Sequence, residues 1–232
     1  MTWRGVLLPL LLASALSAQS FVLPSQYANV AGNGSDYNIF YGPGKTPMQP
    51  VHTQLIYNVA DIPLPAGGIK SIAFRRANST QSTNYAASAD LTIQMGQGNY
   101  HEANAVADFA ANLGANPRLV FQGKVNLPQS AYSGPGPGVF EVLIPFSTPF
   151  VFINTMGPGL VVDITTTTFT STGTGKEVSW YVDAQRMTSS TVSSQGTQGP
   201  SQSNCKFNTG TYSNSRSTPG IYGPGHIFSV TL

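Results

Sequence analysis

This chain has few charged residues and no large excess of either sign. Asp, Glu, Lys and Arg make up 9% of its 232 residues, against about 25% in an ordinary soluble domain. The 11 basic residues nearly balance the 9 acidic ones, and the only adjacent basic pair is Arg75-Arg76. Proteins that bind nucleic acid or an anionic membrane carry basic clusters. The composition therefore argues against both kinds of partner.

Cysteine is almost absent, since Cys205 is the only one. A single thiol excludes a disulfide within the chain, so the fold has to be held together by its core. We expect Cys205 to be a free thiol in a polar loop. A disulfide to another chain is the alternative interpretation.

Long apolar runs are also absent. A membrane-spanning helix needs about 20 apolar residues, and no segment of the sequence reaches that length. The one short run is at the N-terminus, where Arg4 precedes apolar residues 6–12 and small residues follow up to Ala18. This order is typical of a secretory signal peptide. We expect residues 1–19 to be removed on export, leaving no transmembrane segment. The predicted location is secreted: extracellular, periplasmic or at the cell surface.

The chain is rich in segments that alternate apolar and polar residues. Leu91, Ile93 and Met95, for example, alternate with Thr92 and Gln94, as in a strand with one face on a core. Such strands are predicted near residues 21–23, 52–57, 69–75, 89–95, 119–125, 139–146, 150–153, 160–164, 178–183 and 228–232. Pro-Gly turns separate several of them. The sequence predicts an all-β fold, an antiparallel jelly-roll-like β-sandwich.

Two segments depart from the strand pattern. Residues 102–113 have apolar side chains at helical spacing, and Gly114 is suited to end a short helix. Residues 189–220 are rich in Ser, Thr, Gln, Asn and Gly, which predicts a long polar loop. The chain then divides into a signal peptide (1–19), a β-sandwich (20–188), a polar insertion (189–220) and a final strand (221–232). We expect that strand to rejoin the sheet. The first strand, near residues 21–30, is one candidate neighbour, and the sequence leaves the pairing open.

Aromatic residues are the strongest candidates for ligand binding. Tyr37, Phe40 and Tyr41 cluster in one predicted loop, and Tyr222 begins the second of two Tyr-Gly-Pro-Gly turns. Flat rings beside amide groups can stack on sugars, although such residues are also common in ordinary strands and edges. The hypothesis is a sugar-binding surface.

The same loop carries oxygen ligands. Asp36 and Asn38 lie within residues 32–38, which lack the alternating acids of a calcium-binding loop. A structural calcium ion held by Asp36 and Asn38 is one hypothesis, and ordinary turn chemistry is the alternative. No other cofactor is predicted.

Signatures of catalysis are missing from the sequence. There is no Gly-x-Ser-x-Gly motif, and none of the histidines lies in a zinc-type motif. Three acids, Glu141, Asp163 and Asp183, are predicted on strands, opposite the apolar face. Two of them could face each other across neighbouring strands, as a glycosidase requires. Ordinary residues of a polar sheet face explain these acids better.

Several segments together resemble a loose group of uncharacterised exported bacterial single-domain β-sandwich proteins. The segments are YANVAGN (27–33), IAFRR (72–76), LTIQMG (91–96), FAANLG (109–114), VNLP (125–128) and IPFSTPF (144–150). The resemblance covers about residues 27–184 and rests on strands and turns. It implies export and a sandwich fold, and it carries over no active-site residue.

These features predict an exported, non-catalytic protein of the cell surface, envelope or extracellular matrix that acts in adhesion or assembly. A carbohydrate-binding module is the alternative, with polysaccharide or cell-surface components as partners. A glycoside hydrolase or polysaccharide lyase is a distant third.

Overall fold

The computed structural model describes residues 19–32, 34–36, 40, 51–77, 84–99, 108–131, 134, 136–173, 180–185, 205–208, 225–226 and 228–232. The strands are β1 (Ser20–Leu23), β2 (Gly34–Asp36), β3 (Val51–Asn58), β4 (Ala66–Arg75), β5 (Ala87–Gly98), β6 (Arg118–Leu127), β7 (Phe140–Ile153), β8 (Gly159–Ser171), β9 (Val182–Gln185), β10 (Cys205–Asn208), β11 (Gly225–His226) and β12 (Phe228–Thr231). One α-helix, α1 (Phe109–Leu113), and two 3-10 turns, η1 (Ser25–Tyr27) and η2 (Val59–Asp61), complete the described elements. The predicted all-β character is confirmed.

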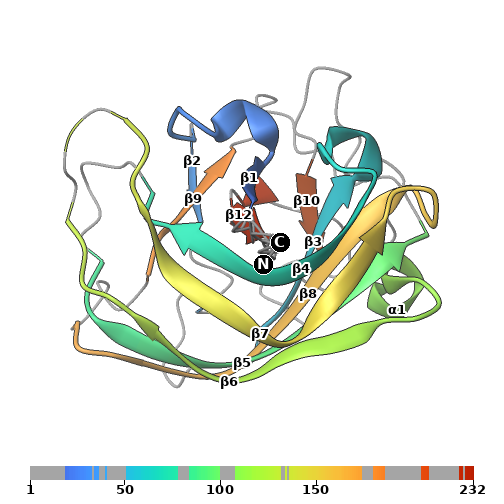
Figure 1. The fold of residues 1–232 in the computed structure, drawn as a ribbon. Coiled ribbons are helices and arrows are strands. Elements are labelled where there is room, and N and C mark those ends of the chain that lie inside the picture. Colours follow the sequence, from blue (N-terminus) through green and yellow to red (C-terminus); the bar gives the residue numbers. More distant parts are fainter. Residues whose placement is uncertain are drawn as a thin grey trace, which may run out of the picture.

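Two packed antiparallel sheets form the sandwich (Figure 1). Their strand orders are β1-β12-β4-β7 and β10-β3-β8-β5-β6. Without β10, each sheet has four strands, and the chain passes repeatedly from one sheet to the other. This is the order of an eight-stranded jelly roll, two Greek keys wrapped around one core. The predicted jelly-roll-like sandwich is confirmed.

The final strand lies beside the first. The return of apolar alternation at the C-terminus predicted that this strand rejoins the sheet, and the structure supplies its neighbours. In β12, Val230 pairs with Phe21 of β1 on one side and with Ile72 of β4 on the other. Leu232 N also donates to Gln19 O at 3.0 Å. Strand β12 therefore lies between β1 and β4 in the four-stranded sheet, although both strands are far from it in the sequence.

The core lies between the two sheets because the inward positions of the strands alternate with polar outward ones. On β5, the inward residues Ala89, Leu91, Ile93 and Met95 are all buried. Trp180 is also fully buried and belongs to this core. These inward rows fill the space between the sheets.

Strand β7 is longer than predicted, since it joins the two expected strands 139–146 and 150–153 into one. Pro145 and Pro149 do not end it, because β7 is the edge strand of its sheet and an edge tolerates residues without an N–H. The pairing with β4 shifts register between Ile69 and Ser71. Ile69 pairs with Phe150 and Ser71 with Pro145, so β7 has more residues than β4 between these two pairs and bulges there.

Helix α1 is the described part of the predicted helical segment. Asp108 caps its start, accepting hydrogen bonds from Ala110 N at 2.9 Å and Ala111 N at 3.3 Å. Gly114 ends it with a φ of +83°, a conformation that glycine adopts without strain. Residues 102–107 lie outside the described part of the chain.

Two small features were not indicated by the sequence. Strand β10 lies within the predicted polar insertion and adds to the edge of β3. Strands β2 and β11 both flank β9 in a separate three-stranded sheet. These strands have two to four residues each, which is too short for an alternating pattern to be recognised.

Candidate functional site

A polar cluster centred on Asp163 lies on the outer face of the five-stranded sheet. Asp163 Oδ1 is 2.7 Å from His52 Nε2, and Asp163 Oδ2 accepts a hydrogen bond of 2.6 Å from Gln54 Nε2. His52 and Gln54 point to the same side because they are two residues apart on β3.

The same cluster fastens helix α1 to the sheet. Gln54 Nε2 also donates to Phe109 O at 2.8 Å, and Asn112 Nδ2 donates to Gln54 Oε1 at 3.1 Å. The His52 ring stacks on Phe109 with a centroid distance of 3.9 Å and an interplanar angle of 25°. The helix therefore covers one end of the outer face, at the right of Figure 1.

Two glycines of β5 let the helix lie directly on the sheet. A Cβ on Gly96 would be 2.0 Å from Leu113 O, and one on Gly98 would be 2.8 Å from Asn112 O. Both positions face outward, where a larger residue would lift the helix. Below the helix, Leu113 packs with Ile56 and Val161 in a small second core. The spacing Gly-x-Gly on a strand was the sequence signal for this close approach.

The Asp163 cluster can orient an imidazole, which is one part of a catalytic base. The His52 side chain is 27% exposed and that of Asp163 is 8% exposed. Within the described part of the chain, no hydroxyl or thiol forms a hydrogen bond with His52. The described contacts therefore position α1 and supply no nucleophile.

A second carboxylate, Asp183, is held by a cation. Arg75 Nε donates to Asp183 Oδ2 at 2.7 Å, and Gly32 N lies 3.0 Å and 3.1 Å from the two carboxylate oxygens. Arg75 Nη2 also donates to Tyr27 O at 3.1 Å and to Val30 O at 2.7 Å. Both side chains of the ion pair are almost completely buried. The pair therefore ties residues 27–32 to the sandwich.

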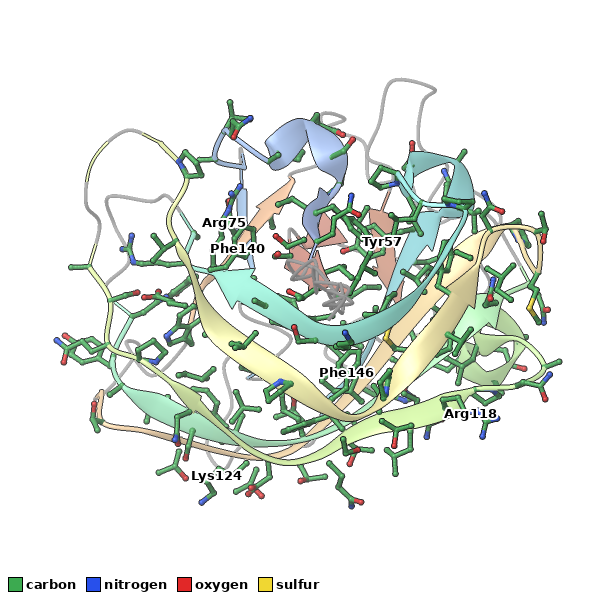
Figure 2. The ribbon with its side chains drawn as sticks, viewed as in Figure 1. Tyr57, Arg75, Arg118, Lys124, Phe140 and Phe146 are labelled. Carbon is green, nitrogen blue, oxygen red and sulfur yellow. The ribbon has the colours of Figure 1, made fainter. Side chains whose placement is uncertain are left out.

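Burial controls the ionisation of Asp183. Removal from water raises the pKa of Asp183 above its ordinary value, while the Gly32 N–H and the charge of Arg75 lower it. The Arg75 guanidinium lies 5.0 Å from the ring centre of Phe140, and Figure 2 shows these two side chains together. The ring shields the cation from solvent on that side.

The possibility that two of the three acids face each other on neighbouring strands is excluded, and two of them are not residues of an exposed polar face either. Asp163 and Asp183 are 6% and 0% exposed. They are buried because α1 covers the outer face over Asp163 and residues 27–32 contact Asp183. Glu141, Asp163 and Asp183 lie on β7, β8 and β9, and no two of these strands are neighbours in a sheet. Glu141 is half-buried, and its charge opposes the lowering of the pKa of Arg76 by burial.

Only one of the predicted ligand-binding residues is among those described. Phe40 is fully buried and packs edge-to-face against Phe74 and Trp180, with centroid distances of 5.8 Å and 5.9 Å. A ring without exposed surface offers no face to a ligand in this structure. Tyr37, Tyr41 and Tyr222 lie outside the described residues.

Residues 41–44, the first Tyr-Gly-Pro-Gly segment, lie outside the described part of the chain. Of the second segment, the structure describes Gly225, which pairs with Gln185 of β9.

The predicted metal ligands and thiol are only partly described. The structure gives the backbone of Asp36 in β2, and Asn38 lies outside the described residues. Cys205 begins β10 at the register position opposite Tyr57. In the part of the chain that the structure describes, no group of three or more His, Cys, Asp or Glu side chains could hold a metal ion. The calcium hypothesis remains a prediction.

Beside α1, the rest of the outer face is a polar surface whose residues are partly or fully exposed among those described, and we call it the polar face. It consists of Thr165, Thr168 and Thr170 on β8, Ser88, Asp90, Thr92 and Gln94 on β5, and Gln122, Lys124 and Asn126 on β6. These positions alternate with the buried inward residues of the same strands. Figure 2 shows Lys124 pointing away from the sandwich. Sequence alternation predicted such faces but not which strands share one.

Comparison with protein-family models, with curated proteins and with solved structures finds no match. Among the described residues, no helix has the length and apolar character needed to cross a membrane. Evidence about function therefore comes from the described surfaces and from the sequence.

Proposed function

We propose that this chain is an exported, non-catalytic protein of the cell surface, envelope or extracellular matrix that acts in adhesion or assembly. The observation that carries the proposal is the polar face on β8, β5 and β6. It presents hydroxyl and amide groups over three adjacent strands, with one acid and one base among its ten residues. Such a face can make many weak polar contacts with a large partner.

The use of the buried ionisable groups supports a non-catalytic role. Asp183 is bonded to Arg75 and Gly32, and Asp163 to His52 and Gln54. Each of these carboxylates holds a segment of the chain on the sandwich. The carboxylate oxygens accept hydrogen bonds from groups of the protein itself, and this supports a role in holding the fold rather than in binding a substrate.

A carbohydrate-binding module is the second candidate, and the same face favours it because hydroxyl and amide groups match the hydroxyls of a sugar. One observation weighs against the usual stacking mode. The large hydrophobic side chains that are exposed in the described residues are Val30, Leu119, Val139, Leu143, Val151 and Met156. None of these is aromatic, so adhesion or assembly in the broader sense is the leading proposal.

The test uses the purified mature chain in two assays. Its mass in solution is measured by light scattering, and its retention is measured on insoluble polysaccharides and bacterial cell-wall fractions with and without calcium. Saturable retention or a high-mass assembly supports the proposal. A monomer that is retained on nothing contradicts it.

An enzyme assay on the same materials completes the test. Release of soluble sugars by the unmodified chain, lost in Glu141→Gln or Asp163→Asn at unchanged melting temperature, would replace the proposal with a glycosidase or lyase. Equal background release from all three proteins is the expected result.

A further inference from the structure

We infer that the polar face is the contact surface for a neutral, hydroxyl-rich polysaccharide, which lies along it beside the stacked His52 and Phe109 rings. This inference rests on the proposed function and names the partner of the proposed surface. It concerns a site on the sheet, separate from the loop tyrosines considered in the sequence.

The strand register arranges the polar face in rows. One row runs from His52 on β3 through Thr165 on β8 and Thr92 on β5 to Gln122 on β6. Further along, Thr168 pairs with Asp90, which pairs in turn with Lys124. In the next row, Thr170 pairs with Ser88, which pairs with Asn126. Neighbouring strands are about 4.8 Å apart, and side chains on one face repeat every 6.6–6.8 Å or so along a strand. A bulge in β8 between Thr165 and Thr168 separates the first row from the other two, and the three rows form one polar array, which we call the grid.

The groups on the grid are available for binding. Within the described residues, the side chains of Thr92, Gln122 and Thr165 form no hydrogen bond with the protein. Hydroxyls and amides both donate and accept, so each can meet either role of a sugar hydroxyl. The polar cluster under α1 is different, because its donors and acceptors are already joined to one another.

The charge of the face selects a neutral partner. Asp90 and Lys124 are cross-strand neighbours, so the one negative and the one positive side chain of the face balance. An anionic polymer would meet no excess of basic groups, and a cationic polymer no excess of acids. A neutral polysaccharide also requires little desolvation of ions on binding.

Apolar surface borders the grid at the end nearest α1. The His52 ring, partly exposed, is stacked on Phe109, and Leu119 on β6 is 50% exposed. Leu119 pairs with Gln94, so the apolar group directly follows the polar rows. The C–H faces of sugar rings can pack on such surfaces while their hydroxyls reach the grid.

The test compares two double variants of matched chemistry. Thr92→Ala/Gln122→Ala removes two groups from one row of the grid. Thr148→Ala/Gln129→Ala removes the same two kinds of group from exposed positions on β7 and after β6, outside the face. The probes are cellulose, chitin and starch granules as neutral polymers, with alginate beads as the anionic one. Retention is measured as a function of protein concentration.

The expected result is saturable retention on at least one neutral polymer, insensitive to 0.5 M salt. The row variant should lose about tenfold or more in affinity, which corresponds to two lost hydrogen bonds. The control variant should stay within about twofold. Equal melting temperatures of the three proteins establish that the folds are intact. The single variant Gln122→Ala, with a loss of about threefold, covers the case in which the double variant unfolds.

Three outcomes would overturn the inference. Full affinity of the row variant would place the binding site elsewhere, while adhesion itself would stand. Retention on alginate alone, abolished by salt, would show a charged partner. A self-assembly that the row variant dissolves, without retention on any polymer, would make a second copy of the chain the occupant. Absence of both retention and assembly would instead contradict the proposed function.

Discussion

The two buried carboxylates of this protein are held in different ways. Asp183 is completely buried and faces the guanidinium of Arg75, which also holds two carbonyl oxygens of the chain near residues 27–30. Asp163 is held by the neutral amide of Gln54 and by His52, at the border of the solvent-exposed face. The first centre depends on a compensated charge inside the protein, whereas the second depends on hydrogen bonds under a small helix.

The difference shows how one residue type acquires different roles from its surroundings. A buried ion pair is costly to break because the remaining charge is left without compensation. A carboxylate near solvent keeps partial access to water, so the loss of one partner costs less. We therefore expect changes around Asp183 to affect the whole fold and changes around Asp163 to affect α1 and the adjoining face.

Removal of the Arg75 guanidinium should have the largest effect on stability. In Arg75→Met the carboxylate of Asp183 remains buried without its ion pair, and we expect the free energy of unfolding to fall by about 3–5 kcal/mol at neutral pH. Urea unfolding followed by tryptophan fluorescence measures the change. The double variant Arg75→Met/Asp183→Asn should recover part of the loss. No recovery would show that the packing of Arg75, rather than its charge, is what matters.

The pH dependence of stability should also reveal the buried pair of Arg75 and Asp183. Burial raises the pKa of Asp183 above its ordinary value of 3.8, so the native state holds this proton more tightly than the unfolded state. The contribution of Asp183 to stability is therefore present at low pH and lost as the pH rises through the raised pKa. Arg75→Met should show this fall more strongly than the unmodified chain. Arg75→Met/Asp183→Asn is the control, and an equal slope in both variants would contradict the assignment.

Changes where α1 lies against β5 should have the next largest effect on stability. In Gly96→Ala the new Cβ would meet Leu113 O at 2.0 Å, so α1 has to move and we expect a loss of about 1–3 kcal/mol. Gly68→Ala is a matched control on β4, because the nearest atom to its Cβ is 4.0 Å away. Thermal unfolding of the two variants measures the difference. Equal melting temperatures would show that α1 does not need this close approach.

The hydrogen bond between His52 and Asp163 should have the smallest effect. His52→Ala removes this bond and the stacking on Phe109 but leaves the Gln54 bond to Asp163, so we expect a loss of about 1 kcal/mol. Amide hydrogen exchange should increase at Asn112 and Leu113, because opening of the helix then breaks fewer contacts with the sheet. Unchanged exchange in the helix would mean that Gln54 and Asn112 hold α1 without the imidazole.

Several parts of the fold could be predicted from local patterns. The alternation on β5 predicted which residues are buried, because a strand has a period of two on any fold. Gly114 predicted the end of α1 from its conformational freedom. The surroundings of Asp163 could not be predicted in this way, since both partners of its carboxylate lie on β3, 109 and 111 positions away in the sequence. Helix α1, from a third segment, is joined to one of them, Gln54.

By itself, the amino-acid sequence determined the longer strands and the one short helix, because apolar periodicity and turn chemistry act over a few residues. The pairing of the last strand with the first came from the tertiary structure. Only the tertiary structure decided that Asp163 and Asp183 are buried, that Phe40 belongs to the core, and that three strands combine their polar sides into one uncovered face. These outcomes depend on which distant segment covers a given side of a strand, and alternation reports that a side is polar without reporting what lies over it.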